Sequence, residues 1–86
     1  MRINEKFSIQ VLNGHTVIID SQSGKACGEV DFNEIKMFLW DLAKEGEITK
    51  QEMLNGVLNK FEISTVLALG EIDTFIKKLK EYGINK

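Results

Sequence analysis

The dipeptide Asn13-Gly14 stands between two short runs of apolar residues and constrains the first third of the chain. Both residues tolerate a positive φ angle, which a two-residue hairpin turn requires at its two central positions. The residues before it, Phe7 to Val11, alternate between apolar and polar, the period of a strand with one buried face. The turn also predicts the strand register, with Leu12 opposite His15, Ile9 opposite Ile18, and Ser8 opposite Ile19.

The strand after this turn, His15 to Asp20, is apolar on both faces, which is typical of a central strand. The cluster Ser21 to Gly24 predicts a second turn. A third strand, Lys25 to Val30, then returns along the second. The pattern that predicts this strand is weak, because Gly28 lies inside it and only Ala26, Cys27 and Val30 are apolar. The sequence therefore predicts a three-stranded antiparallel meander with this weak strand at one edge.

From Asp31 the apolar residues change to helical spacing. Asp31 and Glu34 are three residues apart and predict a capping box at the start of a first helix. Gly46 is expected to end that helix in a left-handed conformation. Met37 and Trp40 lie off its central apolar stripe and fit either peripheral core positions or an exposed contact patch.

Thr49 and Glu52 predict a second capping box and a second helix. Gly56 inside this helix costs about 1 kcal/mol relative to alanine, which suggests close packing there. A third helix is expected from Gly70 to Gly83. The segment Ser64 to Leu69 fits either a separate short helix or the first turns of the third. The fold class is α+β, a three-stranded antiparallel sheet followed by a three-helix bundle.

The 86 residues, taken as 1–86, are enough for one small domain. A net charge of −2 argues against binding nucleic acid or a membrane surface through bulk charge. Cys27 is the only cysteine, so neither an internal disulfide nor a cysteine metal cluster is expected, and a cytoplasmic location is favoured. No apolar run approaches the roughly 20 residues of a membrane span.

No set of residues suggests catalysis. His15 is the only histidine and follows a hairpin turn, where a solvated side chain is the simpler interpretation. Phosphate-binding, dinucleotide and zinc patterns are missing. The sequence therefore predicts a protein that is not an enzyme and carries neither cofactor nor metal.

Three helices beside a small sheet resemble a winged helix-turn-helix, so a DNA-binding regulator is the alternative function. A recognition helix usually presents basic or amide side chains near its start. The predicted third helix instead opens with Gly70-Glu71-Ile72-Asp73, and two carboxylates there would repel phosphates.

The predicted third strand carries neither a proline nor an inward charge, the devices that usually protect a sheet edge. Its small side chains let another backbone come close, so it can accept an extended peptide as a fourth strand. The same edge could pair with a second copy of the chain, so a homodimer stays open. Lys77, Lys78 and Lys80 fit either a solvated helix face or an attractive site for an acidic peptide.

Several blocks in order, over about residues 7–84, are similar to those of the PqqD-like family, the peptide-recognition domains of pathways that modify ribosomal peptides. The blocks are Thr16-Val17-Ile18-Ile19-Asp20, Ile35 with Phe38-Leu39-Trp40-Asp41-Leu42, Glu45-Gly46, Thr49-Lys50-Gln51-Glu52 with Leu58 and Lys60-Phe61, and Glu71 to Leu79 followed by Gly83-Ile84. The resemblance implies a non-catalytic domain that binds the leader of a precursor peptide. It also implies a partner enzyme, commonly a radical SAM maturase.

The site residues come from two predicted elements. The strand to which the peptide would add is formed by Lys25, Ala26, Cys27, Gly28, Glu29 and Val30. The facing wall, inferred from helix angle, is formed by Phe75, Lys78, Leu79 and Tyr82. Lys78 is expected to attract acidic leader residues, and the other three to form an apolar pocket.

Overall fold

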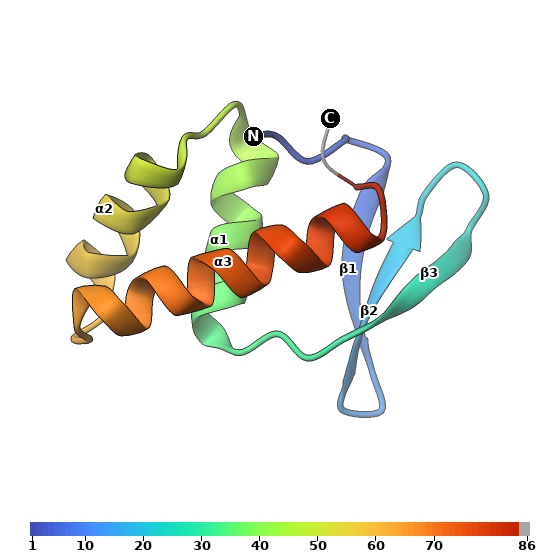
Figure 1. The fold of residues 1–86 in the computed structure, drawn as a ribbon. Coiled ribbons are helices and arrows are strands. Elements are labelled where there is room, and N and C mark those ends of the chain that lie inside the picture. The colour runs from blue at the N-terminus through green and yellow to red at the C-terminus, as the bar shows by residue number, and fades with distance from the viewer. Residues whose placement is uncertain (85–86) are drawn as a thin grey trace.

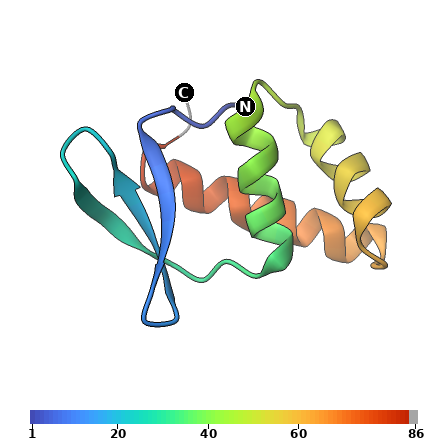
Figure 2. The same ribbon diagram turned by 180° about the vertical axis from the view of Figure 1, so that it is seen from behind.

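The computed structural model describes residues 1–84 and contains three strands followed by three helices (Figure 1). The elements are β1 (Phe7–Leu12), β2 (His15–Asp20), β3 (Lys25–Val30), α1 (Glu34–Glu45), α2 (Lys50–Lys60) and α3 (Thr65–Glu81). The predicted α+β class and element order are confirmed. The helices gather beside the sheet, and α2 lies farthest from it (Figures 1 and 2). No helix within residues 1–84 is long and apolar enough to cross a membrane.

The sheet has the order β1-β2-β3, and both pairs are antiparallel. Asn13 and Gly14 have φ angles of 52° and 79°, so the predicted hairpin turn and the register that follows from it are confirmed. In the second pair, Ile18 lies opposite Gly28 and Ile19 lies opposite Ala26. Cys27 is therefore an extra residue, a β-bulge in β3.

The start of α1 differs from the prediction. Its N-cap is Asn33, whose side chain accepts a hydrogen bond from the backbone N–H of Lys36 at 3.0 Å. The predicted Asp31–Glu34 capping box is therefore wrong. The chain stays extended past Asp31 because the ring of Phe32 packs into the core, 5.6 Å from the ring of Phe75 between centroids.

The end of α1 also differs. Gly46 has a φ angle of 165°, which is extended backbone, so the predicted left-handed cap is wrong. The chain leaves the helix directly toward Ile48, which is buried and whose N–H donates to the carbonyl of Met1 at 2.8 Å.

The predicted capping box of α2 is confirmed. The backbone N–H of Thr49 donates to Glu52 Oε1 at 2.9 Å, and the N–H of Glu52 donates to Thr49 Oγ1 at 3.1 Å. Close packing at Gly56 is also present, because a β-carbon there would lie 3.2 Å from Leu42 Cδ1.

Helix α3 is longer than the sequence predicts. Ser64 is its N-cap, so Ser64 to Leu69 forms the cap and first turns of this helix. Glu71 and Asp73 consequently lie inside the helix, and the expectation that they open it is wrong. The predicted stop at Gly83 is confirmed, with φ 63°. The N–H groups of Gly83 and Ile84 donate to the carbonyls of Lys80 and Leu79, a Schellman ending.

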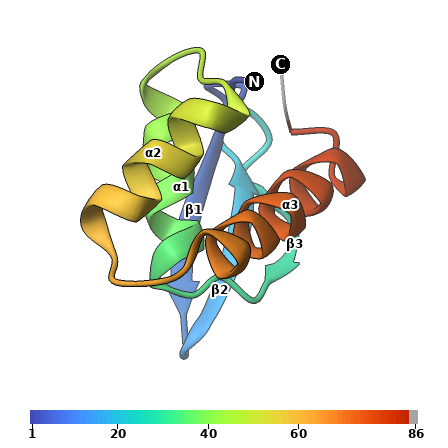
Figure 3. The ribbon, with the colours of Figure 1, turned by 60° about the vertical axis from the view of Figure 1, so that its left-hand side comes forward.

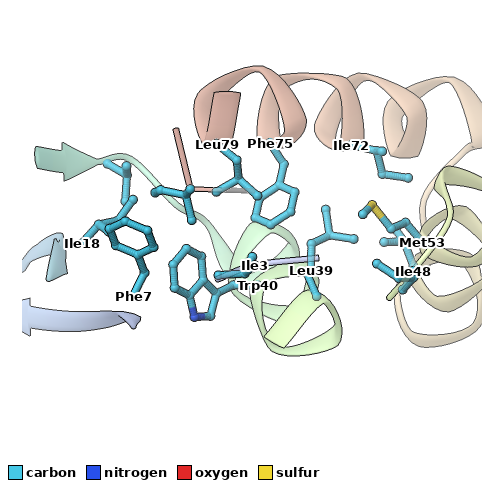
Figure 4. Close-up of a cluster of buried hydrophobic side chains, with 14 of the residues drawn as sticks. Ile3, Phe7, Ile18, Leu39, Trp40, Ile48, Met53, Ile72, Phe75 and Leu79 are labelled. Carbon is cyan, nitrogen blue, oxygen red and sulfur yellow. The ribbon is translucent and has the colours of Figure 1, made fainter. Parts of the chain in front are cut away.

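The core lies where α3 crosses α1 beside the sheet (Figure 4). Phe75 and Leu79 of α3 are fully buried, as are Leu39 of α1 and Ile18 of β2. Trp40 belongs to this core with 4% of its surface exposed, which decides between its two predicted roles. Because α3 is fixed by this core, its outer side chains are held at a constant position beside β3.

Candidate functional site

A groove lies between the end of β3 and one side of α3 (Figure 3 shows the two elements together). Thr74 and Lys78 form its α3 wall, one helical turn apart. Its volume is about 680 Å³. We call it the edge groove, and its lining residues are Gly14, His15, Thr16, Glu29, Val30, Asp31, Phe32, Lys36, Thr74 and Lys78.

The backbone of Glu29 faces outward from the sheet. A two-residue turn closes with a hydrogen-bonded pair, here Leu12 and His15, and such pairs alternate along an antiparallel ladder. Val17 therefore bonds toward β1, and Glu29, which lies opposite Val17, turns its N–H and carbonyl away from β2. Consistently, the Tyr82 hydroxyl donates to the Glu29 carbonyl at 3.1 Å.

Tyr82 follows Thr74 and Lys78 at the same spacing along α3 and packs on Gly28. A β-carbon at residue 28 would come within 2.5 Å of the Tyr82 ring. Gly28 thus allows the end of α3 to approach the backbone of β3. Tyr82 contacts Glu29, which lines the edge groove, and the loop residues Asp31 and Phe32 line it as well.

Lys36, which lines the edge groove, belongs to a partly buried ion pair. Lys36 is only 9% exposed, and its ammonium group donates to Glu71 Oε2 at 2.7 Å. The Asn33 amide donates to the same oxygen at 2.9 Å. The hydrogen bond from Lys36 is the main cause that lowers the pKa of Glu71, and the Asn33 bond adds to it against the effect of burial.

The remaining charges of the edge groove are more exposed. The Lys78 ammonium lies 3.4 Å from Glu81 Oε2, an exposed pair within one turn of α3. His15 and Glu29 are joined across the sheet through Nδ1 and Oε1. Exposed pairs of this kind contribute little to stability. These groups can therefore exchange partners with a ligand at small cost.

The residues that line the edge groove do not form a metal-binding cluster. Among residues 1–84 there is no group of three or more histidine, cysteine or acidic residues placed to hold a metal ion. Cys27 is exposed on β3. What the groove offers is an outward-facing strand backbone beside the exposed ammonium group of Lys78, since that of Lys36 is held by Glu71.

Two solved structures have this fold. One is TbiB1 in complex with the TbiA(beta) leader peptide, with 15% identity, a TM-score of 0.70, and coverage of 100% of this chain and 95% of that chain. The other is lasso peptide synthetase B1 complexed with the leader peptide, with 18% identity, a TM-score of 0.66, and coverage of 99% and 95%. No family model and no curated protein matches the sequence.

The chain shares its fold with these two proteins. The predicted resemblance is thereby confirmed at the level of the fold, since the likeness extends over nearly the whole of each chain. In this chain the third strand is an edge strand and the third helix runs beside it, as the resemblance implies.

The structure brings most of the predicted site residues together. Lys25 to Val30 form the edge strand, and Lys78 and Tyr82 lie on the side of α3 toward it. Phe75 and Leu79 are fully buried. They therefore offer no surface to a ligand, and the expected apolar pocket is not formed by them. They point inward because their apolar side chains pack in the core, and this leaves their neighbours Thr74 and Lys78 on the outer side of the helix.

Several residues that line the edge groove are missing from the predicted site, among them Asp31 and Phe32, which directly follow β3. Thr74 was detectable, because it lies four and eight residues before Lys78 and Tyr82. Lys36 and the hairpin end from Gly14 to Thr16 come from distant elements. No local pattern places them beside α3.

Proposed function

We propose that this chain binds the leader peptide of a ribosomally synthesised precursor and presents it to a separate modifying enzyme. The observation that carries the proposal is the outward backbone of β3 beside the edge groove, in a fold whose two solved relatives hold leader peptides. In this proposal the chain itself catalyses no reaction.

The peptide adds to β3 as a fourth strand. The side chains of Lys25, Ala26, Cys27 and Glu29 are exposed, so a second backbone can approach the edge. Main-chain hydrogen bonds supply affinity that depends little on sequence. Selectivity then comes from the side chains along α3 and around the edge groove.

Lys78 attracts an acidic residue of the leader, exchanging its exposed pair with Glu81 for a pair with the peptide. Tyr82 yields the Glu29 carbonyl to a peptide N–H and keeps its ring beside the bound strand. Phe75 and Leu79 contribute from beneath, by fixing α3 against the core.

The enzyme partner belongs to the proposal as well. The family resemblance points to a radical SAM maturase as the kind of enzyme that receives the leader. A homodimer through β3 would occupy the same backbone groups as the peptide. Measuring the molecular mass in solution, with and without peptide, distinguishes a homodimer through β3 from a monomer that binds the peptide there.

The DNA-binding alternative is not favoured by α3. Its first turn carries no basic residue, and its lysines lie in the last turns. Glu71, farther along the helix, carries a negative charge that would repel phosphates. Its partner Lys36 neutralises this charge and is therefore not free to bind a phosphate.

The test is a titration of the isotope-labelled chain with the leader of the precursor encoded beside its gene, followed by amide chemical shifts. Where no precursor gene lies nearby, peptides selected from a random display library replace it. The largest changes are expected from Ala26 to Val30 and at Lys78 and Tyr82. A peptide of scrambled sequence is the control. Changes confined to α2, or no binding by either source of peptide, contradict the proposal.

A further inference from the structure

A second groove of about 500 Å³ lies between the β1–β2 hairpin and the helices α1 and α2. We call it the apolar groove. The side chains that give it this character are Val11, Phe32, Met37, Phe38 and Phe61. It does not border α3, so it is a separate surface from the edge groove.

The apolar groove arises because the hairpin extends beyond the helices (Figures 1 and 2). Phe7 and Val11 are on the same face of β1, since side chains alternate along a strand. Phe7 is 6% exposed and packed in the core, whereas Val11 is 62% exposed. The apolar face of the strand therefore continues past the point where the helices cover it.

The helical side of the apolar groove is aromatic. The rings of Phe38 and Phe61 meet edge to face, with centroids 5.7 Å apart. Lys60 Nζ lies 4.9 Å from the centroid of the Phe38 ring. Met37, one of the two off-stripe residues of α1, is partly buried and lines the same groove. Such a surface suits an apolar or aromatic side chain.

The two grooves are separate but adjoin each other. Thr16 and Phe32 line both of them. Thr16 lies opposite Val30, the last residue of β3. A peptide strand that runs past the Val30 end of β3 and turns toward Phe32 therefore reaches the border of the apolar groove. Strand addition to the six residues of β3 uses only part of a longer leader, which leaves flanking residues to reach it.

We infer that the apolar groove binds an apolar or aromatic side chain of the same leader peptide, just outside the segment that pairs with β3. This inference rests on the proposed function. It makes the recognised leader bipartite, with a strand segment in the edge groove and an apolar anchor beyond it.

The charges around the two grooves add a sequence preference. Lys78 at the edge groove favours an acidic residue in the strand segment, because its pair with Glu81 is exposed and can be exchanged. At the apolar groove the two carboxylates of Glu34 and Asp41 outnumber the one ammonium of Lys60, which disfavours acidic neighbours of the anchor. The expected leader has its acidic residue in the strand segment and neutral or basic residues around the anchor.

The test compares two substitutions at equally exposed residues. Val11 and Leu67 are both 62% exposed, but Leu67 lies at the start of α3, away from both grooves. In calorimetric titration, Val11→Glu is expected to bind the leader peptide about tenfold more weakly, because one anchor contact is lost. Leu67→Glu is expected to bind it with little change in affinity. Met37→Gln serves as a second variant of the apolar groove.

Peptide truncation completes the test. Removing the leader residues at the Val30 end of the bound strand is expected to weaken binding to the unmodified chain by about the same factor. Val11→Glu is expected to have no further effect on that shortened peptide, because the anchor is already gone.

The results separate the inference from the proposed function. Unchanged binding by both Val11→Glu and Met37→Gln, together with loss of binding in the edge variant Glu29→Pro, overturns the inference and leaves strand addition standing. Absence of binding by the unmodified chain overturns both.

Discussion

The ring of Tyr82 lies against the backbone of Gly28, close enough that a β-carbon at residue 28 would come within 2.5 Å of it. The same side chain donates its hydroxyl hydrogen to the carbonyl of Glu29 at 3.1 Å. The end of α3 is therefore joined to the edge strand through Tyr82, and this contact requires glycine, which has no side chain, at residue 28. This contact holds the wall of the edge groove at its distance from β3.

Gly28→Ala is expected to destabilise the chain by about 1–3 kcal/mol, because the new methyl group displaces the Tyr82 ring and breaks its hydrogen bond. Urea denaturation measures the change. Gly70→Ala is the matched control, since a β-carbon at residue 70 meets no atom within 4 Å. Within α3 that control is expected to stabilise by up to about 1 kcal/mol. Equal stability of Gly28→Ala and the unmodified chain would show that Tyr82 moves away freely.

Tyr82→Phe keeps the ring and removes the hydroxyl, which leaves the Glu29 carbonyl free for a peptide N–H. If the peptide takes this carbonyl from Tyr82, the variant binds the leader about two- to tenfold more tightly, the worth of one net hydrogen bond. Isothermal titration measures the affinity. Weaker binding would mean that the hydroxyl contacts the peptide directly, contrary to the proposed exchange.

The Lys36–Glu71 ion pair makes stability depend on pH in the acidic range. The pKa of Glu71 is lowered from 4.5 by its hydrogen bond with Lys36, so the folded state holds the carboxylate more strongly than the unfolded state does. The resulting stabilisation is fully present above about pH 4.5 and is lost as the pH falls through the folded-state pKa. Glu71→Gln removes this contribution.

Urea denaturation over a series of acidic pH values is expected to show the unmodified chain and Glu71→Gln converging in stability as the pH falls. Asp73→Asn is the comparison, because Asp73 pairs with Lys50 at the exposed surface, where an ion pair contributes little. A constant difference between the unmodified chain and Glu71→Gln at every pH contradicts this role of the carboxylate.

The parts of the fold that follow from the sequence are those decided by neighbouring residues. Asn13-Gly14 predicts the hairpin and its register, because the turn needs positive φ angles that few residues adopt. Thr49 and Glu52 predict the start of α2, because the two side chains satisfy each other's backbone N–H. Neither prediction requires knowledge of the rest of the chain.

The errors occur where tertiary packing decides. Asp31 and Asn33 are both good N-cap residues, and the burial of Phe32 selects Asn33. On α3 the boundary between buried and outward residues passes between Phe75 and Thr74. Helical spacing gives the order of residues around a helix. It does not give the rotation of that order relative to β3, which the core contacts set.

Glu29→Pro tests whether leader binding uses the backbone of β3. The ladder register directs the N–H of Glu29 away from β2, so proline at this edge position removes a donor that the sheet does not use. Glu29→Ala is the comparison, because it removes the same side chain and its contact with His15 but keeps the N–H. Leader affinity is expected to be about tenfold weaker for Glu29→Pro than for Glu29→Ala, since a peptide carbonyl loses its partner. Thermal unfolding of both variants checks that the sheet is intact. Equal affinities in two folded variants would mean that the peptide binds through side chains alone, and strand addition would have to be abandoned.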